Sequence, residues 1–469
     1  MKTINCNLLV LGAGPGGYVA AIRAGQLGVD TVIIDGQAPG GTCLNVGCIP
    51  SKALIHAADE FEKTVQFTGK NALGISVENP KLDLSKTIAW KDSIVKRLNS
   101  GVVGLLKKNK VKLIVGWGEM TDGKTCVVET VDGPVTVKAK NVILATGSVP
   151  VEIPSLPFGG NIISSTEALA LDSMPERLVI VGGGYIGLEL GTAYAKMGAK
   201  VTVVEATDSI LPQYDAELTK PVAASLKKLG IEVMLGTKAM GVNKAGTALK
   251  VQMPDGSEKM IKASKILVTV GRRAKTEGFG LEGLDLTTAG RFVAIGDKCQ
   301  TSMAGVYAIG DLTGEPMLAH RAMAQGEMVA EVVAGENRTF DKVAMPAVCF
   351  TDPEIVTVGL SPDEAKTEGF EIKTGLFPFA ANGRAMTQSS GNGEAETGFV
   401  RVVARKDNHL VLGIQAVGNG IAELSAAFSL ALEMGARLED IAGTIHAHPT
   451  QSEGFQEAAL KALGHALHI

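Results

Sequence analysis

The feature that most constrains this chain is a unit that occurs twice, starting at Asn7 and at Arg177. Each copy reads as an apolar strand, a Gly-x-Gly-x-x-Gly turn, a helix of small residues and a second apolar strand that ends in an acid. The turn glycines are Gly12, Gly14 and Gly17 in the first copy and Gly182, Gly184 and Gly187 in the second. The acids, Asp35 and Glu205, both follow the third glycine by 18 residues.

This arrangement of residues is typical of dinucleotide binding. In such a unit the first glycine allows a tight turn, the second lets a pyrophosphate approach the backbone, and the third lets the helix pack on the strand. The N-terminus of the helix offers free N–H groups to the phosphates. The acid at the end of the second strand accepts hydrogen bonds from ribose hydroxyls. One such turn can be purely structural, but two in register predict two dinucleotide sites.

Other glycines and strands agree with the repeat. Gly28 and Gly198 stand where each helix must stop before the next strand begins. Two further apolar strands end in glycine turns, "NVILATGS" and "ILVTVG", and we expect each to complete one of the sheets. A third, "GVYAIGD", ends at Asp311, which we therefore expect at the carboxyl edge of a sheet, where ligands of such folds bind. A strand followed by a simple acidic turn is the alternative.

The second copy favours NAD over NADP. The four residues after Glu205 are Ala, Thr, Asp and Ser, and none of them offers a cation to a 2′-phosphate. Arg272 and Arg273 lie further along the chain, so the preference for NAD is open until those two side chains are placed.

Composition excludes several functional classes. With 469 residues, the chain is long enough for several domains, and its net charge of −4 predicts no strong attraction to nucleic acid or anionic membranes. The apolar run Leu8–Leu11 is too short for a secretion signal, and no stretch is apolar for the roughly 18 residues of a membrane span. We therefore expect a cytoplasmic protein, in which six scattered cysteines are not a disulfide framework.

Two of the cysteines, Cys43 and Cys48, lie close together in "GGTCLNVGCIPSK". A zinc site would need further Cys or His ligands, and only His56 is close in sequence, so we predict no metal. A structural disulfide would close a very small loop and would tend to be reduced in the cytoplasm. Two unrelated thiols are a further alternative. A reversible dithiol–disulfide pair fits best.

The surroundings predict different roles for the two thiols. We expect Cys43 in a flexible glycine turn, where an incoming thiol reaches it. Cys48 precedes Pro50, which suits the first turn of a helix. A thiolate near a helix start, with Lys52 one turn away, has its charged form stabilised and is the more reactive species.

The polar cluster "HAHPTQSE" near the end of the chain supplies a candidate general base. A carboxylate such as Glu453, hydrogen-bonded to one nitrogen of His448, raises the basicity of the other. A structural His-Pro turn is the alternative. Glu189, on the helix of the second glycine unit, is either a solvent-facing residue or a partner for Lys52.

Taken together, these motifs resemble the flavoprotein disulfide reductases, in order and over the whole chain. The resemblance implies an α/β fold with two Rossmann-like dinucleotide-binding domains and a C-terminal α+β dimerisation domain. It implies FAD in the first unit, held by Gly12, Gly14, Gly17, Asp35, Thr42, Lys52, Gly116 and Asp311. It implies NAD in the second unit, held by Gly182, Gly184, Gly187, Glu205 and Gly271.

The resemblance also implies a division of the chain and of the catalytic work. We expect an FAD domain over 1–147, an NAD domain over 148–275, a central segment over 276–345 and an interface domain over 346–469. In the homodimer, His448 and Glu453 of one subunit would serve Cys43 and Cys48 of the other. Lys52, paired with Glu189, would tune the flavin.

Within this family, the chain looks most like the members that oxidise protein-bound dihydrolipoyl groups with NAD. Such enzymes serve 2-oxo acid dehydrogenase complexes or glycine cleavage, so the expected partners are the lipoyl domains of the acyltransferases or the glycine cleavage carrier protein. The alternatives are another NAD(P)H-dependent reductase of low-molecular-weight disulfides and a flavin-binding scaffold without catalysis. A scaffold has no use for two thiols and a His–Glu pair together.

Overall fold

A computed structural model describes residues 2–389 and 397–469, which form two compact units. The first unit contains the chain up to Leu54 and the stretches Ser85–Val151 and Gly271–Asp341. The second unit contains Ile55–Leu84, Glu152–Val270 and Lys342–Ile469.

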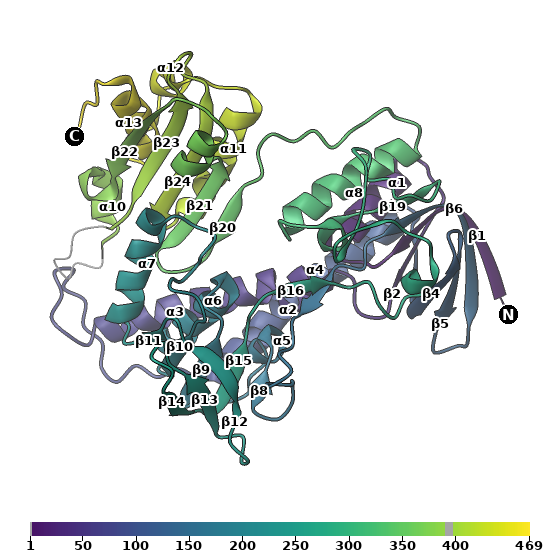
Figure 1. The fold of residues 1–469 in the computed structure, drawn as a ribbon, viewed down its shortest axis with the longest axis horizontal. Coiled ribbons are helices and arrows are strands. Elements are labelled where there is room, and N and C mark those ends of the chain that lie inside the picture. The colour runs from purple at the N-terminus through teal and green to yellow at the C-terminus, as the bar shows by residue number, and fades with distance from the viewer. Residues whose placement is uncertain (1, 390–396) are drawn as a thin grey trace. The chain divides into compact units, whose positions relative to one another are not determined.

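The first unit is built on a seven-stranded sheet in the order β3-β2-β1-β6-β5-β4, with β19 also paired to β6 (Figure 1). Its strands are β1 (Lys2–Leu11), β2 (Thr31–Asp35), β3 (Lys112–Val115), β4 (Trp117–Asp122), β5 (Thr125–Glu129), β6 (Val135–Leu144) and β19 (Val306–Ala308). The pairs β1–β2, β2–β3, β1–β6 and β6–β19 are parallel, whereas β4, β5 and β6 form an antiparallel meander.

Apolar residues explain why this sheet forms. Residues 8–11 of β1 are almost completely buried, as expected of an interior parallel strand that is covered on both faces. Helices α1 (Pro15–Gln26) and α8 (Ala319–Val333) lie side by side in Figure 1. A Cβ added to Gly326 would lie 2.3 Å from the carbonyl oxygen of Gly16, so small residues allow this close helix contact.

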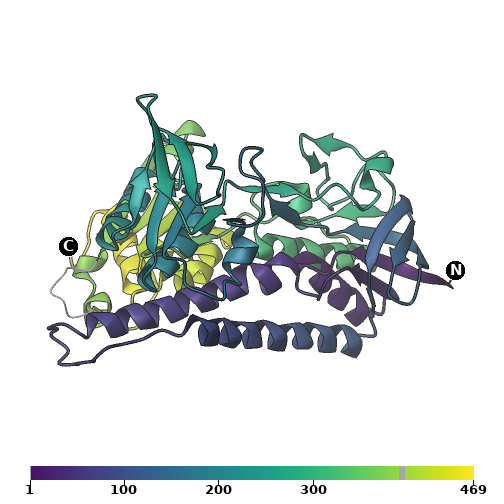
Figure 2. The same cartoon turned by 90° about the horizontal axis from the view of Figure 1, so that it is seen from below.

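The other elements of the first unit flank the sheet. Two small antiparallel pairs are β7 (Ser148–Pro150) with β16 (Arg272–Ala274) and β17 (Thr288–Ala289) with β18 (Phe292–Val293). The remaining helices are α2 (Gly41–Val46), α3 (Cys48–Gln66, which continues into the second unit), α4 (Leu84–Lys108), η1 (Leu281–Gly283) and η2 (Gly310–Thr313). Figure 2 shows α4 as one uninterrupted helix.

The second unit contains a parallel sheet in the order β11-β10-β9-β15-β8 and an antiparallel sheet, β12-β13-β14. These strands are β8 (Ile162–Ile163), β9 (Arg177–Val181), β10 (Lys200–Val204), β11 (Glu232–Met234), β12 (Lys238–Val242), β13 (Ala248–Gln252), β14 (Glu258–Lys262) and β15 (Lys265–Val268). The helices beside them are α5 (Ser165–Ala168), α6 (Tyr185–Lys196) and α7 (Ala216–Lys228).

The C-terminal part of the second unit is a five-stranded antiparallel sheet in the order β20-β21-β24-β23-β22. Its strands are β20 (Ala347–Cys349), β21 (Glu354–Gly359), β22 (Ile372–Pro378), β23 (Phe399–Arg405) and β24 (Val411–Gly418). Its helices are α9 (Pro362–Thr367), η3 (Phe379–Ala381), α10 (Gly383–Thr387), η4 (Ile421–Leu424), α11 (Ser425–Glu433), α12 (Leu438–Gly443) and α13 (Glu453–Leu463).

The fold class predicted from the sequence is confirmed, since a mixed sheet and a parallel sheet each contain one glycine unit and an antiparallel sheet with helices follows. The predicted helix stops are also confirmed, because Gly28 (φ 78°) and Gly198 (φ 109°) both adopt the left-handed conformation just after their helices end. The residue boundaries of the four predicted segments stay a prediction. Within the residues that the structure describes, none of the helices combines the length and the apolar character needed to cross a membrane.

Candidate active site

In the first glycine unit, the terminal acid is bonded to its own turn. The backbone N–H of Ala13, inside the glycine turn, donates to Oδ2 of Asp35 at 2.7 Å. The N–H of Gln37 donates to the other carboxylate oxygen at 2.9 Å. Burial raises the pKa of Asp35, although these two N–H groups and the nearby charge of Lys275 act in the opposite direction.

The second glycine unit repeats these hydrogen bonds. The N–H of Gly183 donates to Oε2 of Glu205 at 2.6 Å, and the N–H of Thr207 donates to Oε1 at 2.8 Å. Gly183 and Thr207 stand 170 positions after the two donors of the first unit, so the repeat seen in the sequence is also a repeat of hydrogen bonds. The Thr207 hydroxyl adds a bond at 2.9 Å.

The first glycine of each turn cannot carry a side chain. Gly12 has φ 102°, and a Cβ there would lie 2.3 Å from the carbonyl oxygen of Ala145. Gly182 has φ 110°, and its Cβ would lie 2.6 Å from the carbonyl oxygen of Thr269. Both turns therefore bring bare backbone to a helix N-terminus at the carboxyl edge of a parallel sheet, which fits the pyrophosphate of a dinucleotide.

The other predicted cofactor residues lie as follows. Gly14 and Gly184 are the N-cap residues of α1 and α6. The N–H of Gly116 donates to the backbone oxygen of Asp35 at 2.9 Å, which places Gly116 beside the acid of the first unit. Thr42 is an exposed residue of α2. Gly271 (φ 126°) accepts a backbone hydrogen bond from Val151, within the first unit. Gly17 and Gly187 lie in the first turns of α1 and α6.

Asp311 lies in η2, after β19, and belongs to a polar chain that sequence reasoning missed. The hydroxyl of Ser148 donates to Oδ2 of Asp311 at 2.5 Å. The guanidinium of Arg272 donates to the hydroxyl of Ser148 at 2.8 Å and to its carbonyl oxygen at 2.7 Å. The order of residues in the sequence does not reveal this chain, because β7 and β16 are paired across more than a hundred intervening residues.

The cysteine segment is attached to the first glycine turn. The N–H of Gly40 donates to the carbonyl oxygen of Ala13 at 2.7 Å, and a Cβ on Gly41 would lie 2.5 Å from Cα of Gly14. The prediction of a flexible turn around Cys43 is wrong, because Cys43 lies in helix α2. Gly40 (φ 117°) provides the sharp turn, and the residues after it are then free to form a helical turn.

Cys43 is half-buried in α2, and Cys48 is exposed as the first residue of α3. The pKa of Cys43 is raised well above that of an ordinary thiol, first by its hydrogen bond to Cys48 and then by burial. The charge of Lys52 acts in the opposite direction. Cys43 therefore tends to keep its proton, whereas Cys48 lies exposed at the start of a helix.

Glu189 is buried, with only 4% of its surface exposed, so a solvent-facing position is wrong. Its carboxylate accepts a hydrogen bond of 2.9 Å from the backbone N–H of Phe350, which offsets part of the desolvation of the charge. Lys52 is a half-buried residue of α3. Pairing between Lys52 and Glu189 stays a prediction.

His448 and Glu453 form the hydrogen bond that the sequence predicts, with 2.9 Å between Nδ1 and Oε1. The other oxygen of Glu453 accepts the N–H of Thr450 at 2.8 Å. Burial acts to raise the pKa of Glu453, but these hydrogen bonds outweigh it, and the pKa is lowered. The His448 side chain is 80% exposed, so its Nε2 atom is available to a partner from outside the chain.

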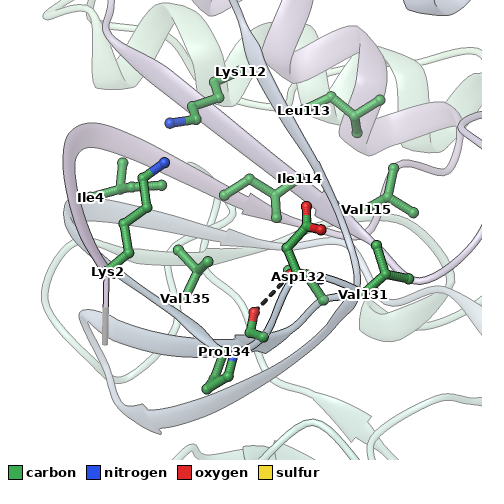
Figure 3. A pocket seen from close by; sticks show the side chains of 12 residues that line it. Lys2, Ile4, Lys112, Leu113, Ile114, Val115, Val131, Asp132, Pro134 and Val135 are labelled. Carbon is green, nitrogen blue, oxygen red and sulfur yellow. Dashed lines mark hydrogen bonds between the residues drawn. The ribbon is translucent and has the colours of Figure 1, made fainter.

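A hollow of about 770 Å³ lies elsewhere on the first unit, lined by β1, β3 and the turn before β6 (Figure 3). Lys2 and Lys112 rise from neighbouring parts of its rim, and its floor is apolar. None of the candidate site residues lines this hollow.

Comparison with known proteins places these features in a family. The pyridine nucleotide-disulphide oxidoreductase family matches residues 6–326, and the dimerisation domain of the same family matches residues 345–459.

Among curated relatives, dihydrolipoyl dehydrogenase of Pseudomonas aeruginosa is 60% identical, with both chains covered over 100% of their length. Dihydrolipoyl dehydrogenase 2 of Haloarcula marismortui is 46% identical over 99% of this chain and 98% of its own. The solved structure of LpdA from Mycobacterium tuberculosis has a TM-score of 0.88 at 27% identity, covering 98% of this chain and 99% of that one.

Proposed function

Since the chain belongs to the pyridine nucleotide-disulphide oxidoreductase family, we propose that it is a dihydrolipoamide dehydrogenase, which oxidises dihydrolipoyl groups to the disulfide and reduces NAD. Relatives that carry this name match the chain over its full length. The single observation that carries the proposal is the bond between Gly40 and Ala13, because it ties the dithiol segment to the first dinucleotide turn.

Two cofactors fit the two glycine units. FAD suits the first glycine unit, where Asp35, Gly116, Thr42, Lys52 and Asp311 would hold it together with the turn glycines. NAD suits the second glycine unit, where Glu205 would hold it, with Gly271 as a further expected contact. Bound flavin supplies a two-electron link between thiol chemistry and hydride transfer to nicotinamide. The residues of the chain itself bind, orient and move protons.

The thiol steps follow from the properties of the two cysteines. His448 accepts a proton from one lipoyl thiol, and the resulting thiolate attacks the sulfur of Cys43 in the disulfide form of the pair. The Cys43–Cys48 bond breaks, and Cys48 leaves as a thiolate that the helix start and Lys52 stabilise. The second lipoyl thiol then displaces Cys43, which takes up a proton, and the lipoyl disulfide is complete.

In the proposed mechanism, the general base comes from the other subunit of a dimer. The dimerisation domain at 345–459 supports a homodimer, in which His448 and Glu453 of one copy would serve Cys43 and Cys48 of the other. The protein partners would be the lipoyl domains of 2-oxo acid dehydrogenase acyltransferases or the glycine cleavage carrier protein, in the cytoplasm.

NAD is favoured over NADP because the residues after Glu205 offer no cation. Arg272 and Arg273, which left the choice between NAD and NADP open, both have partners within the first compact unit. Arg272 is bonded to Ser148, and Arg273 pairs with Glu277 at 3.6 Å.

Purified protein tests the proposal directly. We expect a yellow protein that reduces NAD with dihydrolipoamide and does not act on glutathione. Rapid reduction of oxidised glutathione with NADPH, together with no activity on dihydrolipoamide, would contradict the proposal.

A further inference from the structure

Lys275, which directly follows β16 in the first compact unit, has no role in the proposed function. Its backbone is held at both ends, because its N–H donates to the carbonyl oxygen of Gly147 at 2.9 Å and its carbonyl oxygen accepts the hydroxyl of Thr146 at 2.8 Å. Its ammonium lies 5.0 Å from the ring centroid of Trp117 and 4.6 Å from that of Phe279. Cations at such distances are attracted by the faces of aromatic rings.

The aromatic pair brings this ammonium to the end of β2. A Cβ on Gly36 would lie 2.4 Å from the indole ring of Trp117, so the ring packs directly on the residue that follows Asp35. Lys275 and Asp35 are close enough to influence each other's charge. The Lys275 ammonium therefore lies near the carboxylate that the proposed function uses for the ribose of FAD.

In the proposed role of Asp35 as an acceptor for ribose hydroxyls, its carboxylate has to be ionised. An ionised carboxylate accepts hydrogen bonds with both oxygens, whereas a protonated one gives up part of that capacity. Burial raises the pKa of Asp35, and the Lys275 cation opposes this effect. Glu205, at the equivalent position of the second unit, instead receives the neutral hydroxyl of Thr207 as an extra donor at 2.9 Å.

We propose that Lys275 is a positioning residue for the adenosine end of FAD, acting through Asp35 while Trp117 and Phe279 hold its ammonium in place. This inference rests on the proposed function, because it takes FAD as the ligand of the first unit. It adds a residue that the glycine repeat does not contain and that has no counterpart in the repeat.

The test is a titration of FAD into flavin-free protein, followed by the quenching of flavin fluorescence. Lys275→Met keeps most of the aliphatic stem and removes the charge, and it should raise the dissociation constant of FAD about tenfold, the factor that corresponds to one pKa unit of interaction. Lys275→Arg keeps the charge and the cation–π contact and should bind FAD within about twofold of the wild type. Lys107→Met, at an exposed position of α4, is the matched control and should change nothing.

Three outcomes overturn the inference. If Lys275→Met binds FAD as tightly as the wild type, the charge has no role. If Lys275→Arg is as weak as Lys275→Met, the residue acts by shape alone. If the flavin-free wild type does not bind FAD at all, the proposed function fails as well, so the two failures are told apart by the wild-type titration. Equal thermal unfolding midpoints of the flavin-free variants check that folding is unchanged.

Discussion

The two glycine units share a scaffold and differ in what is packed on it. In the first, the carbonyl oxygen of Ala13 accepts the N–H of Gly40, which begins the cysteine segment. In the second, the equivalent oxygen of Gly183 accepts the N–H of Leu211 at 3.0 Å, from a loop in which Ile210 and Leu211 are buried. The same backbone acceptor therefore holds the segment with the two cysteines in one glycine unit and a loop without cysteines in the other.

We infer that dinucleotide binding and thiol chemistry are separate properties of the glycine unit. The glycine turn and the terminal acid, which are common to both copies, serve the binding of a dinucleotide. Thiol chemistry depends on the segment that follows the second strand, which only the first copy equips with cysteines. Changes to the shared parts should affect binding, and changes to the attached segment should affect turnover.

The largest effect should come from Cys48→Ser, in the segment that distinguishes the first unit. Without this sulfur the disulfide cannot form, so turnover of dihydrolipoamide should fall by about 10³-fold or more, the scale seen when a catalytic nucleophile is removed. Flavin should stay bound, because the glycine turn is unchanged. Steady-state NAD reduction and the visible absorption of the purified protein measure the two properties, and loss of flavin together with activity would break the proposed separation.

His448→Gln tests the base, which belongs to neither glycine unit. Turnover should fall by roughly 10²-fold, the usual scale for a general base, while flavin stays bound. The matched control is His446→Gln, a half-buried histidine whose Nδ1 lies 2.8 Å from the carbonyl oxygen of Thr444. An unchanged rate for His448→Gln, or an equal loss in the control, would remove His448 from the mechanism.

Gly12→Ala and Gly182→Ala compare the shared parts directly. The added Cβ atoms would lie 2.3 Å and 2.6 Å from backbone oxygens at positive φ, and strain of about 1–3 kcal/mol corresponds to roughly 5- to 150-fold in affinity. Gly12→Ala should weaken FAD binding and leave NAD binding intact. Gly182→Ala should raise the KM for NAD with FAD retained. If both variants lost the same cofactor, the two units would not be separate sites.

The smallest effect concerns the order in which the two thiols react. In reduced, flavin-free protein at pH 8, the raised pKa of Cys43 keeps that half-buried thiol protonated, whereas Cys48 is exposed to the reagent. Iodoacetamide should therefore label Cys48 about tenfold faster than Cys43, because thiolates are the nucleophiles. Mass spectrometry of the singly labelled protein gives the ratio. Faster labelling of Cys43 would contradict the order.

The local sequence pattern was sufficient to predict the strands, helices and turns of the glycine units. The apolar run of β1, the glycine turn after it and the stop at Gly28 depend on neighbouring residues, so the sequence predicts them correctly. The hydrogen bond between His448 and Glu453 was also predictable, because the partners are only five positions apart in the chain. The roles of these residues stay predictions.

Contacts between segments that lie far apart along the chain could not be predicted from the sequence. The helix around Cys43 was read as a turn because its glycines suggested flexibility, whereas packing of Gly41 on Gly14 orders the segment. Glu189 gave no signal of burial, because its carboxylate is satisfied by the backbone of Phe350, 161 positions away. Lys275 belonged to none of the motifs, and Ser148 was only the last residue of the pattern "NVILATGS".

The sequence by itself determined that this chain holds two dinucleotide units and a thiol pair, because glycine conformation, strand hydrophobicity and acid spacing are local properties. Folding raised the pKa of Cys43 and brought the cation of Lys275 close to Asp35. Those properties arise from burial and from charges that folding brings close together. The energies of such contacts depend on the distances between atoms in space, and the order of residues along the chain does not give these distances.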